Sequence, residues 1–448
     1  MATNRLIDRV RNTGGPRRPG GGSAEYDEIK KTLQAELLDS LDFEEVSNTP
    51  KDELAQRLRQ TLTERVEARN VPLNRMERER AVQEILDNIL GLGPIEPLLR
   101  DPAVSDILIN GPKAVFVDRK GKLIKTNVNF DDNKHLMQII ERIVVAVGRR
   151  VDEQNPMVDA RMQDGSRFNA IIPPLALDGA AVSIRRFGTV PIGPDDLIAF
   201  GSVPRPLMEV LRGAVHCGLN AIISGGTGSG KTTLLNVLSS FIPSDERIIT
   251  IEDSAELQLQ QPHVVRLETR PPNLEGKGEV TQRDLVKNCL RMRPDRIILG
   301  EIRGGEAIDM LTAMNTGHDG SLATVHANNT RDALARFETM VGIGMPNMTP
   351  RAIRETIARA LDVIIQQSRL MDGSRRVVSI TEVTGMEGDV ITTQDIFVFQ
   401  QEGVDKNGKV FGRFKATGIR PRFASRLAAY GIHLSPQLFE FEMEVGRG

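Results

Sequence analysis

The sequence of 448 residues has few cysteines, few aromatic residues and no long apolar run. Its two cysteines, Cys217 and Cys289, form no CxxC pair, which excludes a disulfide framework and a tetracysteine zinc site. Polar residues interrupt one of the most apolar stretches, residues 136–147, which is shorter than the roughly 18 apolar residues that a membrane-spanning helix needs. We therefore expect a cytoplasmic protein that folds without disulfides.

The sequence also lacks an excess of charge of either sign. Its 58 lysines and arginines nearly balance 60 aspartates and glutamates, and aromatic residues make up only 4% of the chain. A surface that stacks single strands needs basic and aromatic residues along one stripe, and we find none. We expect no stable binding of nucleic acid.

The chain is too long for one hydrophobic core, since single cores stop growing at roughly 250–300 residues. Residues 1–23 are rich in glycine, proline and arginine, which predicts a disordered arm. Apolar residues recur at helical spacing over residues 24–92, which predicts a small helical bundle. Residues 93–187 combine short strand patterns with one helix and indicate an α+β domain, and residues 188–200 indicate a linker. The strand patterns of the α+β domain lie at residues 104–109, 114–117, 123–128, 168–172 and 181–186.

The second half of the chain alternates strand, loop and helix. Strands are predicted at residues 221–224, 247–251, 264–267, 296–299 and 322–325. This alternation predicts an α/β domain over residues 201–371, with a mostly parallel sheet covered by helices on both faces. The remaining residues, 372–448, have β-like segments and a final helix from about Phe423, and are predicted to form a C-terminal extension.

A phosphate-binding motif follows the first of these strands. Residues 225–232 read GGTGSGKT, which matches GxxxxGK[ST] between a predicted strand and a predicted helix. The glycines let successive N–H groups turn toward an anion, and the N-terminus of the helix adds positive charge. Lys231 should reach the β- and γ-phosphates of ATP, and the Thr232 hydroxyl should bind Mg²⁺. The predicted nucleotide-binding residues are Gly226, Thr227, Gly228, Ser229, Gly230, Lys231, Thr232 and Thr233.

Acidic residues follow two other predicted strands. Glu301 ends the segment RIILGE, whereas Glu252 and Asp253 follow ITI, with Glu256 close behind. Because ligands of open α/β sheets bind at the carboxyl ends of strands, Glu301 should emerge beside the phosphates. There it could orient or deprotonate the attacking water, or hold the metal through water. Glu252 and Asp253 could contribute to the same chemistry or merely cap a following helix.

Histidines and arginines complete the candidate residues. His318 and His326 flank the strand at residues 322–325 and are either structural or sensors of the nucleotide state. A guanidinium brought to the phosphates from the same or another subunit would accelerate phosphoryl transfer, although most such arginines are simply solvated. The candidates in the α+β domain are Arg161, Arg167, Arg185 and Arg186.

With these motifs assembled, the chain resembles the secretion-superfamily ATPases of the CpaF (tight-adherence pilus) branch. The resemblance runs from about Gly93 to Arg369 through PLLRDPAVSDILINGP, PMVDARMQDGSRFNAIIPPLA, VSIRRF, SGGTGSGKTTLLN, ITIEDSAELQL, LRMRPDRIILGEIRGGEA and TGHDGSLATVHANN. It implies a RecA-like P-loop ATPase domain and a ring-shaped homohexamer. It also implies that residues 227–233 form Walker A, Glu252 and Glu256 belong to the acidic box, Glu301 is the Walker B glutamate and His326 belongs to the histidine box.

The resemblance further implies that the N-terminal domain closes over the nucleotide and lends it arginines. The chain would then be a hexameric motor that powers assembly, with retraction as an additional option, of a tight-adherence pilus, next to platform proteins of the inner membrane. The tetracysteine insert of the type II secretion and type IVa pilus ATPases is absent. Two alternatives stay open, a traffic ATPase of type IV secretion and a P-loop motor that translocates nucleic acid.

Overall fold

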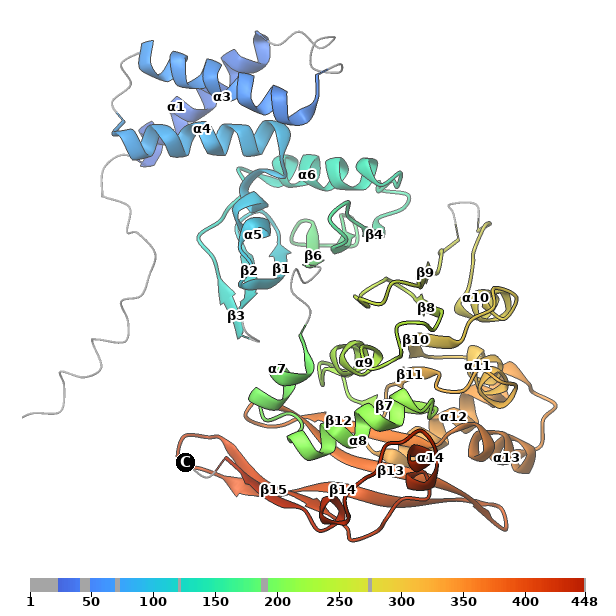
Figure 1. Cartoon of the computed structure of the whole chain (residues 1–448). Coiled ribbons are helices and arrows are strands. Elements are labelled where there is room, and N and C mark those ends of the chain that lie inside the picture. Colours follow the sequence, from blue (N-terminus) through green and yellow to red (C-terminus); the bar gives the residue numbers. More distant parts are fainter. Residues whose placement is uncertain are drawn as a thin grey trace, which may run out of the picture. The chain divides into compact units, whose positions relative to one another are not determined.

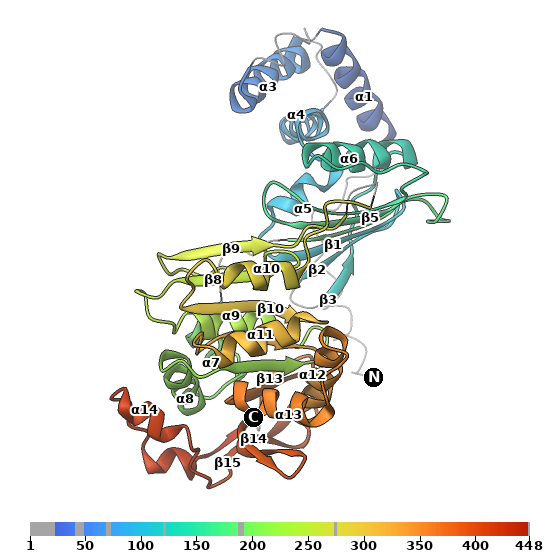
Figure 2. The same cartoon turned by 90° about the vertical axis from the view of Figure 1, so that its right-hand side faces the viewer.

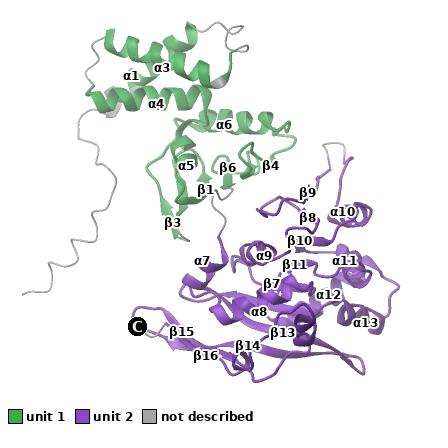
Figure 3. Ribbon diagram, in the orientation of Figure 1, with its two compact units in different colours: residues 1–187 green, residues 188–448 purple. Residues whose placement is uncertain are grey.

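The computed structural model describes residues 23–40, 49–68, 73–119, 122–186, 192–272 and 276–446. The chain divides into two compact units, residues 1–187 and 188–448 (Figures 1 and 3). A disordered arm is predicted for residues 1–23, of which residues 1–22 lie outside the described residues. Residues 188–191 of the predicted linker also lie outside them. The rest of that linker includes a short helix, α7 (Pro194–Ala199).

Three helices occupy the range in which the apolar spacing predicts a bundle: α1 (Ser23–Asp39), α3 (Lys51–Ala68) and α4 (Arg75–Leu90). Their leucines, isoleucines and valines, among them Leu37, Leu62 and Ile85, form a hydrophobic cluster of their own. A capping box of Asn74 and Glu77 fixes the start of α4 by bonding two backbone N–H groups. The helices therefore form a module with a separate small core.

The first unit also contains a six-stranded antiparallel sheet in the order β3-β2-β1-β6-β5-β4. Its strands are β1 (Val104–Asn110), β2 (Val115–Arg119), β3 (Lys122–Lys125), β4 (Met157–Arg161), β5 (Arg167–Ile171) and β6 (Ala181–Arg185). Before them lie a 3-10 turn, η1 (Gly93–Ile95), and the short helix α5 (Glu96–Arg100). Ile107, Phe168 and Ile184 are buried on one face of the sheet and pack with the apolar side of α6 (Asn133–Ala146). The opposite face carries polar and charged side chains.

The second unit is built on a ten-stranded sheet in the order β16-β15-β14-β13-β12-β7-β11-β10-β8-β9. The six strands from β12 to β9 are parallel: β7 (Ala221–Gly225), β8 (Ile248–Glu252), β9 (Val264–Glu268), β10 (Arg296–Ile302), β11 (Leu322–Val325) and β12 (Val363–Arg369). The predicted α/β class with a parallel-rich sheet is confirmed.

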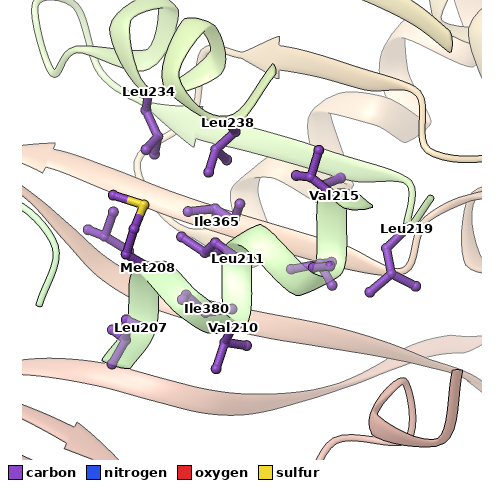
Figure 4. Packing of buried hydrophobic residues seen from close by; sticks show 14 of the residues in the cluster. Leu207, Met208, Val210, Leu211, Val215, Leu219, Leu234, Leu238, Ile365 and Ile380 are labelled. Atoms are coloured by element: carbon purple, nitrogen blue, oxygen red, sulfur yellow. The ribbon is translucent and has the colours of Figure 1, made fainter. Parts of the chain in front are cut away.

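Helices cover both faces of the parallel strands (Figure 2). Alternate residues of each strand belong to two different clusters, with Ile223 and Ile365 in one and Ile222 and Ile364 in the other. The first cluster includes residues of α8 (Arg205–His216) and α9 (Lys231–Ser239). Figure 4 shows Leu211 of α8 within this cluster, together with Leu238 of α9. The second cluster includes residues of α10 (Gln282–Cys289), α11 (Glu306–Asn315), α12 (Thr330–Gly344) and α13 (Pro350–Ala360).

The C-terminal segment, predicted as an extension over residues 372–448, is part of the second unit. It continues the same sheet, because β12 pairs antiparallel with β13 along its whole length, from Val363↔Glu382 to Arg369↔Arg375. Phe397 and Phe414 enter the cluster under α8. The added elements are β13 (Arg375–Glu387), β14 (Val390–Val404), β15 (Val410–Ala416), α14 (Ala424–Ala429), η2 (Pro436–Phe439) and β16 (Glu442–Val445). In the described parts of the chain, no helix is both long and apolar enough to cross a membrane.

Candidate active site

The loop between β7 and α9 has the backbone that the phosphate-binding motif requires. Gly228 and Gly230 have φ angles of +69° and +94°, a region that side-chain-bearing residues rarely adopt. A Cβ atom built on Gly225 would lie 2.3 Å from the carbonyl oxygen of Gln367, so only glycine fits there. The loop can therefore curl in the way that turns backbone N–H groups toward an anion.

Lys231 begins α9 and lies against this loop. Its Nζ donates to the carbonyl oxygen of Gly226 at 3.1 Å. Burial lowers the pKa of Lys231, while the charge of Glu301 acts in the opposite direction. Lys231 and Glu301 therefore lie within electrostatic reach of each other.

Glu252 ends β8 and is almost completely buried, with 3% of its surface exposed. Its Oε2 accepts the backbone N–H groups of Glu256 at 2.8 Å and Leu257 at 3.0 Å, whereas the buried Oε1 has no partner among the described residues. Burial raises the pKa of Glu252 to about 7. A carboxyl group with a pKa near neutrality can exchange a proton at physiological pH. The helix-capping alternative is wrong, because the next helix, α10, begins only at Gln282.

Arg303 connects the ends of two parallel strands, β10 and β8. Its Nη2 lies 2.9 Å from Glu301 Oε2 and its Nη1 lies 2.8 Å from Asp253 Oδ2. The hydrogen bond to Glu301 raises the pKa of Arg303. Our sequence reasoning missed this residue, although positions two apart at the end of a strand point to the same side.

The two histidines lie at opposite ends of β11. His326 follows the strand and lines a cavity of about 510 Å³ together with Arg303, Asn328 and Arg336. His318 precedes the strand, whose first residue pairs with Ala221 at the start of β7, so His318 lies at the edge of the sheet remote from the phosphate loop. The alternative that His318 senses the nucleotide state is therefore wrong. For His326 this alternative stays open.

Three of the four candidate arginines form a row across the sheet of the first unit. Arg161 on β4 is opposite Arg167 on β5, which in turn is opposite Arg185 on β6. Arg167 pairs with Asp159 at 3.0 Å and Arg185 with Asp106 at 3.3 Å. Like charges directly opposite each other destabilise a sheet, and the carboxylates of Asp159 and Asp106 offset this repulsion here.

Arg186 does not belong to this row. Its Nη1 donates to the carbonyl oxygen of Val104 at 3.0 Å and also to that of Asp101. These contacts tie β6 to the segment that precedes β1. They give Arg186 a structural role within its own unit.

The described residues contain no group of three or more histidine, cysteine, aspartate or glutamate side chains that could hold a metal ion. Mg²⁺ beside a nucleotide is usually bound by phosphate oxygens, water and only one or two protein groups. Thr232, in the first turn of α9, and Glu301, at the end of β10, lie at the same edge of the sheet and fit that role.

Comparison with known proteins identifies the family. The family model described as type II/IV secretion system protein matches residues 88–416. A putative conjugal transfer protein of Mycobacterium tuberculosis is 37% identical over 308 residues, which cover 67% of this chain and 87% of that protein. The type IV secretion system protein VirB11 of Bartonella henselae is 32% identical over 331 residues, which cover 64% of this chain and 91% of that protein.

A solved structure, the VirB11 ATPase of the Brucella suis type IV secretion system in complex with sulphate, is 28% identical and covers 64% of this chain and 94% of that one, with a TM-score of 0.35. Within the sheet the parallel strands lie in the order β12-β7-β11-β10-β8, and the phosphate loop follows β7. This strand order is the RecA-like arrangement. The chain therefore belongs to the type II/IV secretion system protein family and is an ATP-hydrolysing enzyme with a RecA-like nucleotide-binding domain.

Proposed function

We propose that this chain is the ATPase of a type IV secretion apparatus, using the energy of ATP hydrolysis to drive transport from the cytoplasmic side of the inner membrane. The proposed chemistry of the site rests on one observation. The phosphate loop, Glu301 and Glu252 converge at a single edge of the parallel sheet. The transport role is supported by the relatives named as conjugal transfer and VirB11 proteins. This favours the type IV secretion alternative over a pilus motor.

In this proposal each residue of the site has a separate task. The N–H groups of residues 226–233 and Lys231 bind the β- and γ-phosphates, and Thr232 binds the Mg²⁺ ion that neutralises their charge. Glu301 orients the attacking water and takes its proton. Glu252, with its free buried oxygen, is placed to accept that proton or to replace Glu301 as the base. His326 reports the state of the γ-phosphate to β11 and α12.

The arginine row of the first unit completes the site in this proposal. The chain acts as a homohexamer. Arg161, Arg167 and Arg185 of one subunit approach the phosphates that another subunit holds. Phosphate oxygens would accept hydrogen bonds from the guanidinium groups of this row, which lie on one face of the sheet. Closure over the nucleotide then links hydrolysis to movement.

A tight-adherence pilus motor is the second candidate function. It is favoured by the module of α1, α3 and α4, almost all of which precedes residue 88, where the match to the family model begins. In a pilus motor this module would bind a platform protein of the inner membrane. A motor for nucleic acid is the third candidate, and we expect no stable binding of DNA.

A deletion strain separates these functions. Loss of secretion or of conjugative transfer, with surface pili unchanged, supports the first proposal, whereas loss of pili supports the second. Complementation with Lys231→Ala should fail and complementation with Arg359→Ala should succeed, because the exposed Arg359 on α13 lies outside the site. ATPase activity of the purified chain that rises severalfold on adding DNA would contradict both and favour the third.

A further inference from the structure

Two arginines face each other at the end of the β12–β13 hairpin. Arg369 is the last residue of β12 and Arg375 is the first residue of β13, and the register places their Cα atoms opposite each other. Direct opposition of like charges costs stability in a sheet. Asp372 in the turn between them is engaged by Ser374 at 2.6 Å and by the N–H of Val410 at 2.8 Å. Within the described ranges neither guanidinium has an acidic partner.

Both arginines lie at the phosphate loop. Arg375 Nε donates to the carbonyl oxygen of Gly228 at 2.9 Å. A Cβ atom built on Gly228 would lie 3.7 Å from Arg369 Nη1, and one built on Gly230 would lie 3.2 Å from Arg375 Cδ. The hairpin therefore places two uncompensated positive charges directly beside a loop that is shaped for an anion.

The order of the strands decides which end of a nucleotide these arginines would face. β12 lies on one side of β7, whereas β11, β10 and β8 lie on the other, together with Glu301 and Glu252. Hydrolysis occurs at the γ-phosphate, so that end of the nucleotide must point toward the carboxylates. The α-phosphate and the ribose then lie on the side of β12.

We propose that Arg369 binds the α-phosphate of a nucleoside di- or triphosphate, and that Arg375 is a positioning residue that holds the phosphate loop through Gly228. The inference rests on the proposed function, in which this loop holds ATP, and adds a binding residue that the recognised sequence motifs do not contain. The bound phosphate supplies the negative charge that the hairpin lacks. The same contact serves ATP and ADP, since both carry the α-phosphate.

A contact with a group that hydrolysis leaves unchanged stabilises the ground state and the transition state equally. Arg369→Ala should therefore raise KM about tenfold with kcat unchanged, and should weaken ADP and a non-hydrolysable ATP analogue by the same factor of about ten. Calorimetric titration of the full chain with unlabelled nucleotides and Mg²⁺ measures this, because a label on the ribose would disturb the end under test. Arg359→Ala removes another exposed arginine, on α13, and should bind nucleotide normally.

Thermal unfolding distinguishes nucleotide binding by Arg369 from a purely structural role of this residue. Removing Arg369 relieves the repulsion of Arg375, so the Tm of the nucleotide-free chain should stay the same or rise, while the increase in Tm on adding ADP should shrink. Arg375→Ala should also weaken nucleotide binding. Arg375→Lys should restore most of it, since lysine keeps the charge and a donor for the Gly228 oxygen.

Several results would overturn the assignment. One is normal ADP affinity in Arg369→Ala, another is a fall in kcat with ADP affinity unchanged, and a third is a lower Tm of the nucleotide-free variant. Lys231→Ala separates a failure of the proposed nucleotide site from a failure of the role proposed for Arg369 and Arg375. If Lys231→Ala still binds ADP, the proposed nucleotide site itself fails, whereas loss of binding in Lys231→Ala and normal binding in Arg369→Ala refute only the role of the hairpin.

Discussion

Arg303 donates from Nη2 to Glu301 Oε2 at 2.9 Å, so the carboxylate proposed as the base is held in an ion pair at the end of β10. Glu301→Gln keeps the side-chain volume and removes the negative charge. We expect the variant to bind ATP normally and to hydrolyse it at least about a hundredfold more slowly, because no group at this position can take the proton. Steady-state ATPase rates and a binding titration measure the two effects. Near-normal hydrolysis here, with loss of activity in Glu252→Gln, would assign the base to Glu252.

Lys231→Ala removes the side-chain charge that faces the β- and γ-phosphates. We expect nucleotide binding to become undetectable at concentrations that saturate the wild-type chain, because no other side chain of the loop carries a positive charge. Titration of the folded variant with an ATP analogue measures this. Circular dichroism serves as the control for folding, and wild-type affinity in a folded variant would show that this loop does not hold the phosphates.

Glu252 should make stability depend on pH. Its pKa rises from 4.5 to about 7, so the folded chain holds this proton more tightly than the unfolded chain does. The cost of the buried charge, about 3 kcal/mol, is fully present above pH 7 and disappears as the pH falls toward 4.5. Glu252→Gln lacks this cost. We therefore expect the Tm difference, variant minus wild type, to be more positive at pH 8 than at pH 5.5.

Glu209→Gln is the control for this measurement, since the side chain of Glu209 is exposed on α8 and not among the groups that shift the pKa of Glu252. Its Tm difference should change little between the two pH values. An equal difference at both pH values for Glu252→Gln would mean that Glu252 is charged throughout this range.

Mixed rings test whether Arg167 acts in another subunit. Lys231→Ala and Arg167→Ala are each expected to be inactive alone, the second because an arginine brought to the phosphates in trans adds roughly 10³–10⁵ to turnover. If Arg167 serves a neighbouring site, rings that contain both variants include sites with an intact lysine and an intact arginine, and ATPase activity reappears. Mixed assembly is verified by native mass spectrometry. No recovery at any ratio would place Arg167 in its own subunit or give it only a structural role.

The sequence predicted the parts of the site that depend on local pattern. The phosphate loop was recognisable because GGTGSGKT is contiguous and lies between a strand and a helix, and Glu301 and Glu252 because each ends an apolar strand. The row of Arg161, Arg167 and Arg185 was not predictable, since it depends on the pairing of β4, β5 and β6. β4 itself was missed, because Met157–Arg161 alternates too weakly to stand out.

The contacts around the phosphate loop were hidden for the same reason. Arg375 follows Gly228 by 147 positions, and only the antiparallel return of β13 along β12 brings them together. The pairing of β12 with β13 is also why the sequence alone does not indicate that the C-terminal extension continues the sheet of the ATPase domain. Its strands have ordinary alternation, and nothing in that pattern indicates which strand they extend.

The pairing of β12 with β13 also limits where this chain can be cut. Truncation of the nucleotide-binding core after Met371 would remove β13, which pairs with β12 from Val363 to Arg369. The buried strand would become an open edge with apolar side chains, the type of edge that recruits strands of other molecules. We expect such a truncated chain to aggregate, whereas one that begins at residue 192 and retains residues up to 446 keeps β12 paired with β13 inside the sheet.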